Sequence, residues 1–353
     1  MAAVQFTQIH PRAFAHPSDV RATSAFERLP LFPELLKTIS KLGIEERFRA
    51  HHMHHSVLLS SHQFPSLNRM VHEVAERLSV PPPKTYLTRQ GGANAFVFGR
   101  NTHSIVLTTG LVDLMTEREL QGIIAHEMGH ILCQHMLYMG VGLALTSHAV
   151  PFLKKIPGLE ETVAGLFFSW FRAAEYSADR AALLILEDPE PLAQALSRLA
   201  GVPRKYEAEF DLRLFSEQVA DYAEEATWWS KIATFGMDLF LSHPEPAKRV
   251  NAILQWSESD AYKAILSGRY LTKFEAEALD DAILIEGFRS CPLCLTPVGQ
   301  APVCPNTRCG LEQDPQRQQL CPNEHVAGID WRFCIVCGNA LTQGARCSGT
   351  PDR

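Results

Sequence analysis

The chain has 353 residues, of which 46% are hydrophobic and 20% charged, and its formal net charge is −6. This length allows two or three domains, each with a buried core. Surfaces that bind nucleic acid are usually basic, so the acidic balance argues against nucleic acid as a partner. Residues 1–20 do not combine a basic segment with an apolar one, and we therefore expect no secretory signal.

The first 60 residues are predicted to form a helical and loop-rich segment. Residues 29–59 have helical periodicity, with lysine and glutamate on the polar side. This stretch contains four histidines: His51, His52, His54 and His55. Because no cysteine or carboxylate pattern accompanies them, a solvent-exposed helix face is favoured over a metal-loading or pH-sensing role.

A short sheet is predicted next. Residues 65–80 have the apolar spacing of a helix, which three prolines end. Residues 84–89 alternate as a strand does. Residues 93–99 and 104–112 predict two further strands, joined by a turn at 99–103.

A long helix follows these strands. Thr116 precedes it and Glu119 lies three residues later, which is the spacing of a capping box. No helix-breaking residue interrupts the pattern until past Met136. A second long helix is predicted over 163–186, with further helices between 190 and 279. The expected fold class is therefore α+β and mainly α-helical, with a small sheet.

Residues 126–130 read HEMGH, a pattern typical of zinc hydrolases. On a helix, His126 and His130 lie one turn apart on the same face and can bind one metal ion. Glu127 lies on an adjacent face, where it can act as general base toward a metal-bound water. Zinc lowers the pKa of such a water to about 7. The alternative is that these are two helix histidines without a metal.

A zinc hydrolase needs a third protein ligand. Glu175 is the best candidate, because an acidic residue in a mostly apolar helix needs a reason. Asp179 lies on the same face and could orient a ligating histidine. The alternative is that both are exposed and that Asp179 pairs with Arg172 or Arg180.

These motifs together resemble a known family. HEMGH is followed 45 residues later by EYSAD, and the segments GGANAFVFG, ELQGIIAHEMGH and LSHPEPAKRVNAI lie around them. This combination is similar to the HtpX-like zinc endopeptidases, a gluzincin group that includes the CAAX prenyl proteases. The resemblance spans about residues 64–254. It implies a gluzincin-like metallopeptidase domain with a small edge sheet beside the catalytic helix.

The resemblance also implies roles for single residues. Glu175 would be the third zinc ligand, and Asp179 would support the site through His126 or Arg249. His243 would stabilise the oxyanion of the tetrahedral intermediate. A substrate peptide would add in extended form along an edge strand. The residues of that strand implied to bind it are Asn94, Ala95 and Phe96.

One apolar region bears on localisation. Residues 136–171 are rich in apolar side chains, interrupted by His148 and Pro151. Either they form buried helices beside the active site or they contact a membrane. Membrane members of the family carry N-terminal transmembrane helices, and none is visible here before His126. We expect a cytoplasmic protein, with membrane association through 136–171 left open.

The C-terminal region predicts two structural zinc sites. Of nine cysteines, eight lie after residue 290, with regular spacing. The first predicted ligand set is Cys291, Cys294, Cys304 and Cys309. The second is Cys321, His325, Cys334 and Cys337, with Cys347 as an alternative to His325. We expect a metallopeptidase domain at 61–285, a double zinc ribbon at 286–345 that could contact a protein partner, and a tail at 346–353.

The function predicted is zinc-dependent hydrolysis of peptide bonds in protein substrates, including misfolded or membrane-associated proteins. Three zinc ions per chain are expected, one catalytic and two structural. Two alternatives remain open. One is an adaptor in which the ribbons bind a partner and the peptidase domain is latent or non-catalytic. The other is a metal-storage protein that uses the histidine cluster and the ribbons.

Overall fold

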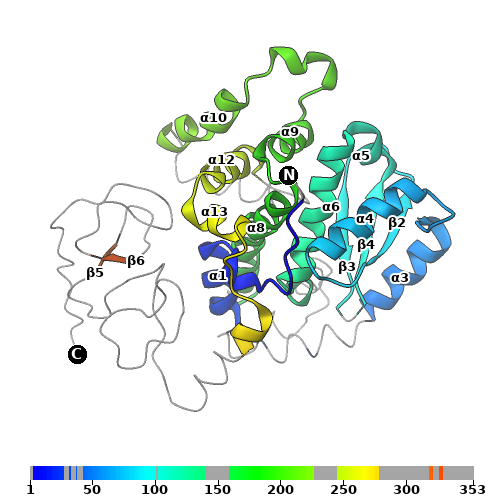
Figure 1. Ribbon diagram of the computed structural model, residues 1–353, viewed down its shortest axis with the longest axis horizontal. Helices are drawn as coiled ribbons and strands as arrows, with labels where there is room; N and C mark the ends of the chain where they lie inside the picture. The colour runs from blue at the N-terminus through cyan, green and yellow to red at the C-terminus, as the bar shows by residue number, and fades with distance from the viewer. Residues whose placement is uncertain are drawn as a thin grey trace. The chain divides into compact units, whose positions relative to one another are not determined.

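The computed structural model describes residues 3–27, 32, 37, 43–100, 102–139, 159–225, 245–277, 318–320 and 326–328. The chain divides into two compact units, Met1–Tyr270 and Leu271–Arg353. Most described elements of the first unit are helices, and one four-stranded sheet lies at one side of them (Figure 1), which confirms the predicted fold class. The domain boundary predicted near residue 285 lies outside the described residues.

The sheet contains the three predicted strands and one more. Its spatial order is β1 (Val57–Leu58), β2 (Lys84–Thr88), β4 (Ser104–Thr108) and β3 (Ala95–Phe98). β2 and β4 run parallel, whereas β1 pairs antiparallel with β2 and β3 pairs antiparallel with β4. β1 falls in a stretch predicted as helix. β3 lies at one edge of this sheet.

The strand predicted at 104–112 ends early. Helix α5 (Thr109–Leu114) begins directly after Thr108, whose hydroxyl accepts a hydrogen bond from the Leu111 N–H and caps the helix. Gly110 passes so close to the loop before β3 that a Cβ there would overlap the Gly91 carbonyl oxygen. The strand therefore ends at Thr108, and the close approach at Gly110, which the apolar pattern did not reveal, follows in the first turn of α5.

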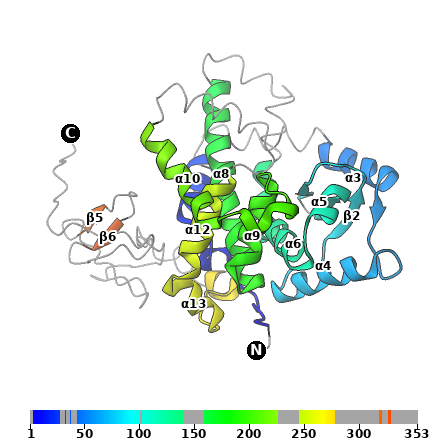
Figure 2. The same cartoon turned by 90° about the horizontal axis from the view of Figure 1, so that it is seen from above.

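Two helices lie beside the sheet in Figures 1 and 2, α3 (Ile44–His55) and α4 (Pro65–Arg77). Three of the four histidines on α3 are exposed, as predicted. The prediction is wrong for His52, which is buried. Its ring lies against the rings of Tyr86, Phe96 and Phe98. His52 is therefore a packing residue between α3 and the sheet.

Helix α6 (Glu117–Leu132) begins as predicted. Glu119 donates its backbone N–H to the Thr116 hydroxyl, and its carboxylate accepts from the Thr116 N–H, so the capping box is present. The same carboxylate accepts from Arg198 Nε at 2.9 Å. The predicted continuation past Met136 is wrong: α6 ends at Leu132, and Gln134 adopts a left-handed conformation with φ 58°, which a helix cannot include.

Helix α6 lies between two layers (Figure 2). It contacts α4 and β3 on one side, and α8 (Leu159–Leu186) and α9 (Pro189–Leu199) on the other. The long helix predicted at 163–186 is thus confirmed. The remaining helices that the structure describes are η1 (Pro11–Ala13), α1 (Pro17–Glu27), η3 (Arg204–Glu209), α10 (Leu212–Glu225), α12 (Pro246–Ser257) and α13 (Asp260–Leu266).

Most of the apolar region and the ligands of the predicted zinc ribbons lie outside the residues that the structure describes. Within the described ranges, no helix has the length and apolar character needed to cross a membrane. Of the apolar region 136–171, only 136–139 and 159–171 are described. In the second unit, β5 (Gln318–Leu320) pairs antiparallel with β6 (Val326–Gly328). The proposed ligands of both zinc ribbons, Cys347 included, lie outside the described residues, so the ribbons stay a prediction.

Small residues bring α6 and α8 into close contact. A Cβ on Gly129 would lie 2.8 Å from Ala181 Cβ and 2.9 Å from Ala178 Cα. Both alanines are fully buried. The two helix backbones can approach this closely only because residue 129 carries no side chain.

We predict that Gly129→Ala lowers the free energy of unfolding by about 1–3 kcal/mol, because the new methyl group meets backbone atoms that cannot move aside. Gly122→Ala on the same helix is the matched control. Its Cβ would come closest to Leu186 Cδ1, the end of a flexible side chain, and alanine favours a helix over glycine by about 1 kcal/mol. Urea unfolding measures both. Unchanged or increased stability of Gly129→Ala would contradict the prediction.

Candidate functional site

Two helices bring His126, His130 and Glu175 together in the protein interior. The histidines lie one turn apart on α6, and Glu175 faces them from α8. All three side chains are buried. One nitrogen or oxygen atom from each lies within 4.8 Å of the others. The structure therefore assembles the three side chains that were predicted as metal ligands.

The spacing of these atoms fits a tetrahedral metal ion. His126 Nε2 lies 3.1 Å from His130 Nε2 and 3.5 Å from Glu175 Oε2, and His130 Nε2 lies 3.2 Å from Glu175 Oε1. Tetrahedral zinc with bonds of about 2.0–2.1 Å places its ligand atoms about 3.3 Å apart. Two imidazoles and one carboxylate are a known donor set of catalytic zinc. The residues present thus fit zinc.

Asp179 and Arg249 hold this cluster in place. His126 Nδ1 lies 2.9 Å from Asp179 Oδ1, and Arg249, on α12, donates from Nε and Nη2 to the two Asp179 oxygens at 2.7 and 2.6 Å. Arg249 Nη1 lies 2.8 Å from Glu175 Oε2. Both carboxylates are buried, so the alternative in which they are exposed surface residues is wrong.

The charges around the histidines set their pKa values. Burial by itself lowers the pKa of His126, but Glu175 and Asp179 more than offset this and raise it to about 9. Burial lowers the pKa of His130 to about 3. Burial raises the pKa of Asp179, but the neighbouring Arg249 outweighs it, and the pKa lies below its usual value. Asp179 is therefore an ionised acceptor for His126 Nδ1–H, so a metal that binds His126 must do so at Nε2 and displace the proton that the raised pKa keeps there.

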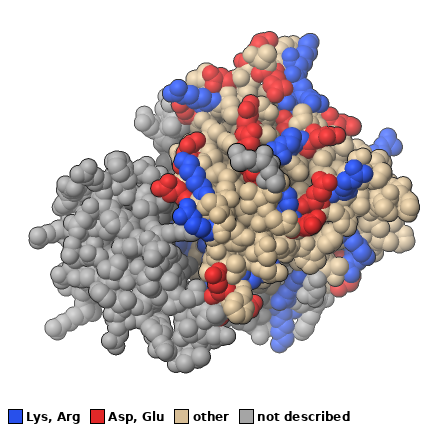
Figure 3. All heavy atoms as spheres, in the orientation of Figure 1, with Lys and Arg blue, Asp and Glu red and all other residues tan. Residues whose placement is uncertain are grey.

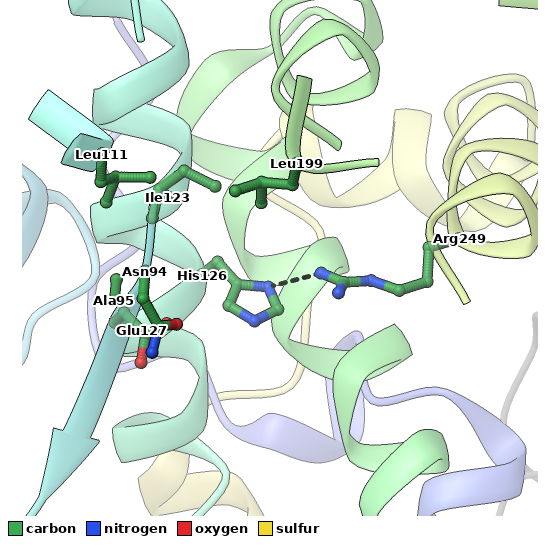
Figure 4. Close-up of a pocket in the computed structure, with 8 residues that line it drawn as sticks. All are labelled: Asn94, Ala95, Leu111, Ile123, His126, Glu127, Leu199 and Arg249. Carbon is green, nitrogen blue, oxygen red and sulfur yellow. Dashed lines mark hydrogen bonds between the residues drawn. The ribbon is translucent and has the colours of Figure 1, made fainter. Parts of the chain in front are cut away.

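A pocket opens beside His126 (Figure 4). Glu127, Asn94 and Ala95 contribute to its wall, where Ala95 is the first residue of β3 and Asn94 precedes it. The residues that line it are Asn94, Ala95, Leu111, Ile123, His126, Glu127, Leu199 and Arg249. Phe96, the third residue predicted to bind peptide, packs with Phe48 and His52 instead. The structure thus brings Asn94 and Ala95, but not Phe96, to this pocket.

One predicted site residue is not described by the structure, and two residues near the site were not predicted. His243, predicted as the oxyanion donor, lies outside the described residues. Sequence analysis missed His135 and Asp19: His135 Nδ1 lies 2.8 Å from His130 Nδ1, and His135 Nε2 lies 3.0 Å from Asp19 Oδ2. A histidine five residues after His130 was the available signal for the first. No local pattern points to Asp19.

The sequence of this chain is similar to those of known metallopeptidases. A family model described as "Peptidase family M48" matches residues 61–257. The Plastoglobule-localized metallopeptidase 48 of Arabidopsis thaliana is 30% identical over 269 residues, which cover 74% of this chain and 77% of that protein. A Protease HtpX homolog of Ralstonia pickettii is 28% identical over 229 residues, covering 57% and 77%.

Among solved structures, that of S. mikatae Ste24p aligns with a TM-score of 0.39 and 17% identity, covering 67% of this chain and 61% of Ste24p. The family match spans more than half of the chain and includes the HEMGH helix, and family M48 peptidases are in general zinc-dependent. The resemblance inferred from the motifs is thereby confirmed. This chain belongs to peptidase family M48 and is an HtpX-like metallopeptidase.

Proposed function

We propose that the chain is a zinc-dependent endopeptidase in which Glu127 is the general base. The observation that carries this proposal is the convergence of His126, His130 and Glu175, at distances that fit zinc, beside a pocket that contains Glu127. Zinc held there would act as a Lewis acid and lower the pKa of a water to about 7. The chain's own residues supply the proton transfers and the binding of the peptide.

The surroundings of Glu127 support its proposed role in proton transfer. Its side chain is buried, and it lines the same pocket as His126, the residue before it on α6. An ionisable group in such a site needs a functional or structural reason. In this proposal, the Glu127 carboxylate takes a proton from the attacking water and passes it to the leaving amine. Asp179 and Arg249 keep His126 and Glu175 in position during both transfers.

The peptide would bind along β3. This strand lies at the edge of the four-stranded sheet, and its first residues reach the pocket beside His126. An extended peptide can add to such an edge by main-chain hydrogen bonds, which do not depend on side-chain identity. Binding of this kind suits an endopeptidase that acts on many protein segments.

Selectivity would come from the apolar part of the pocket. Leu111, Ile123 and Leu199 form one side of it (Figure 4), so it should accept a small apolar substrate side chain next to the cleaved bond. On the face shown in Figure 3, acidic and basic side chains are interspersed over the described surface. We therefore do not expect that face to select peptides by charge.

The proposal also includes the expected roles of His243 and of the C-terminal ribbons, and the expected substrates. His243 would stabilise the oxyanion of the tetrahedral intermediate, as the family resemblance implies. The C-terminal ribbons would hold two structural zinc ions and could contact a protein partner. Misfolded or membrane-associated proteins would be the substrates, with the enzyme in the cytoplasm or associated with a membrane through 136–171.

Substitution Glu127→Gln tests the proposed base. We expect it to lower cleavage of an unfolded protein such as casein by about 10²–10⁴-fold, because the amide cannot accept the proton, while the zinc content stays unchanged. Glu117→Gln, an exposed position at the start of the same helix, is the control and should retain full activity. Equal activity of wild type and Glu127→Gln would contradict the assignment. No cleavage by either, at full zinc content, would favour the adaptor alternative.

Substitution Leu199→Ala tests the pocket. Truncation of this partly buried side chain enlarges the apolar part of the pocket. The ratio of kcat/KM for substrates with larger over those with smaller apolar side chains should therefore rise about 10-fold. Cleavage sites in casein, identified by mass spectrometry, give this ratio. The control is Leu214→Ala, an exposed leucine on α10, which should leave the cleavage sites unchanged. An unaltered pattern in Leu199→Ala would show that this pocket does not select the substrate.

A further inference from the structure

The two metal-facing histidines are supported in different ways. His126 Nδ1 lies 2.9 Å from Asp179 Oδ1, so a carboxylate contacts this ring directly. His130 Nδ1 lies 2.8 Å from the Nδ1 of a second imidazole, His135. The other ring nitrogen of His135, Nε2, lies 3.0 Å from Asp19 Oδ2. A carboxylate therefore stands behind each histidine, but at His130 it acts through one intervening ring.

The end of α6 directs His135 back toward His130. The left-handed conformation of Gln134 turns the chain, and the His135 N–H donates to the His130 carbonyl at 3.0 Å. The His135 ring is buried and meets the Trp170 ring edge-on, with centroids 5.6 Å apart. Backbone and side chain together hold His135 in one orientation.

Asp19 is held just as firmly on α1. The hydroxyl of Ser177, on α8, donates to Asp19 Oδ2 at 2.6 Å, and the Thr23 hydroxyl donates to Asp19 Oδ1 at 3.2 Å. Burial raises the pKa of Asp19, but His135 and the two hydroxyls outweigh it, and the pKa lies below its usual value. Asp19 is therefore an ionised group that only accepts hydrogen bonds.

The directions of the hydrogen bonds follow from this. His135 Nε2 must carry the hydrogen that points at Asp19. The arrangement that suits a metal on His130 has His135 as a neutral imidazole, whose unprotonated Nδ1 accepts from His130 Nδ1–H. His130 Nε2 is thereby left unprotonated and faces Glu175 at 3.2 Å. This is the protonation state that a metal ligand requires.

We propose that Asp19 and His135 are positioning residues for the metal ligand His130, so that metal affinity depends on helix α1 at the N-terminal end of the chain. Asp19 fixes the tautomer of His135, and His135 fixes the tautomer and orientation of His130. The inference rests on the proposed function, because it assumes that His130 binds the catalytic metal through Nε2.

The same residues suggest a competing interpretation. Ligand atoms of Asp19, Cys133 and His135 also lie within 4.8 Å of one another. A metal there would take the lone pair of His135 Nε2 and move the hydrogen to Nδ1. Two N–H groups would then face each other across the 2.8 Å between His135 and His130. A second metal at this cluster therefore opposes metal binding by His130. Burial, with the Asp19 charge, also raises the pKa of the Cys133 thiol well above its ordinary value.

Cobalt titration of the zinc-free full-length chain tests the proposal without requiring activity. The absorption bands of the catalytic site are those that the His126→Ala variant loses. Asp19→Asn and His135→Leu should weaken Co²⁺ binding at this site about 10- to 100-fold, the usual effect of losing such a support. His135→Gln should retain most of the affinity, because its amide oxygen can still accept from His130 Nδ1–H.

Glu187→Gln is the control for a general loosening of the N-terminal segment. Glu187 accepts from the Val4 N–H at 2.8 Å and from Arg77 Nη2 at 2.5 Å, and neither bond touches the metal-facing residues. Its Co²⁺ affinity should equal that of wild type. If Asp19→Asn does not fold, the Co²⁺ affinities of His135→Gln and His135→Leu are sufficient to test the proposal.

Three results would overturn the proposal. The first is unchanged Co²⁺ affinity in both Asp19→Asn and His135→Leu. The second is an equal loss in His135→Gln and His135→Leu, which would indicate a merely structural role. The third is loss of one cobalt equivalent in Cys133→Ser, which would place a metal at the second cluster. By contrast, absence of the site bands in wild type would contradict the proposed function itself.

Discussion

The contact between α6 and α8 at Gly129 is the constraint on which the rest of the first unit depends. Because Gly129 lies directly against Ala178 and Ala181, His126 and His130 on α6 come within 3.5 and 3.2 Å of Glu175 on α8, a separation that suits ligand atoms around one metal ion. Functional groups need to be held within about 0.5 Å of their working geometry. A larger residue at 129 would separate the helices by more than that.

Close packing alone would not make the site stable, because it buries ionised groups. Arg249, on a third helix, α12, compensates the buried negative charges by contacting both Glu175 and Asp179. A buried carboxylate without a cationic partner costs several kcal/mol. The α6–α8 pair and α12 are therefore parts of one arrangement, in which a structural ion pair and the candidate metal centre share the same carboxylates.

The proposed role of Asp19 extends this arrangement to a fourth helix, α1. Ser177, which bonds to Asp19, lies on α8 between Glu175 and Asp179. Arg180, one residue after Asp179, donates to the backbone carbonyls of Phe14 and Ala15. The segment of α8 that supplies the candidate ligand thus also anchors the N-terminal segment. Asp179 would orient one histidine directly, and Asp19 the other through His135.

The sequence by itself determined the parts of this protein that depend on neighbours within a few residues. The capping box at Thr116 predicted the start of α6, and helical spacing placed His126 and His130 on one face. Periodicity also revealed the three main strands and α8. Glu175 needed the family resemblance, because its candidate role depends on how α8 packs against α6.

Only the tertiary structure decided where β4 and α6 end and which distant residues meet at the site. A close backbone approach at Gly110 follows the end of β4 at Thr108, and a left-handed residue, Gln134, stops α6 before Met136. The contact of Asp19 with His135 joins residues 116 positions apart. Local propensity acts over one or two turns, whereas this contact arises from the packing of α1 on α8, to which no local pattern of residues points.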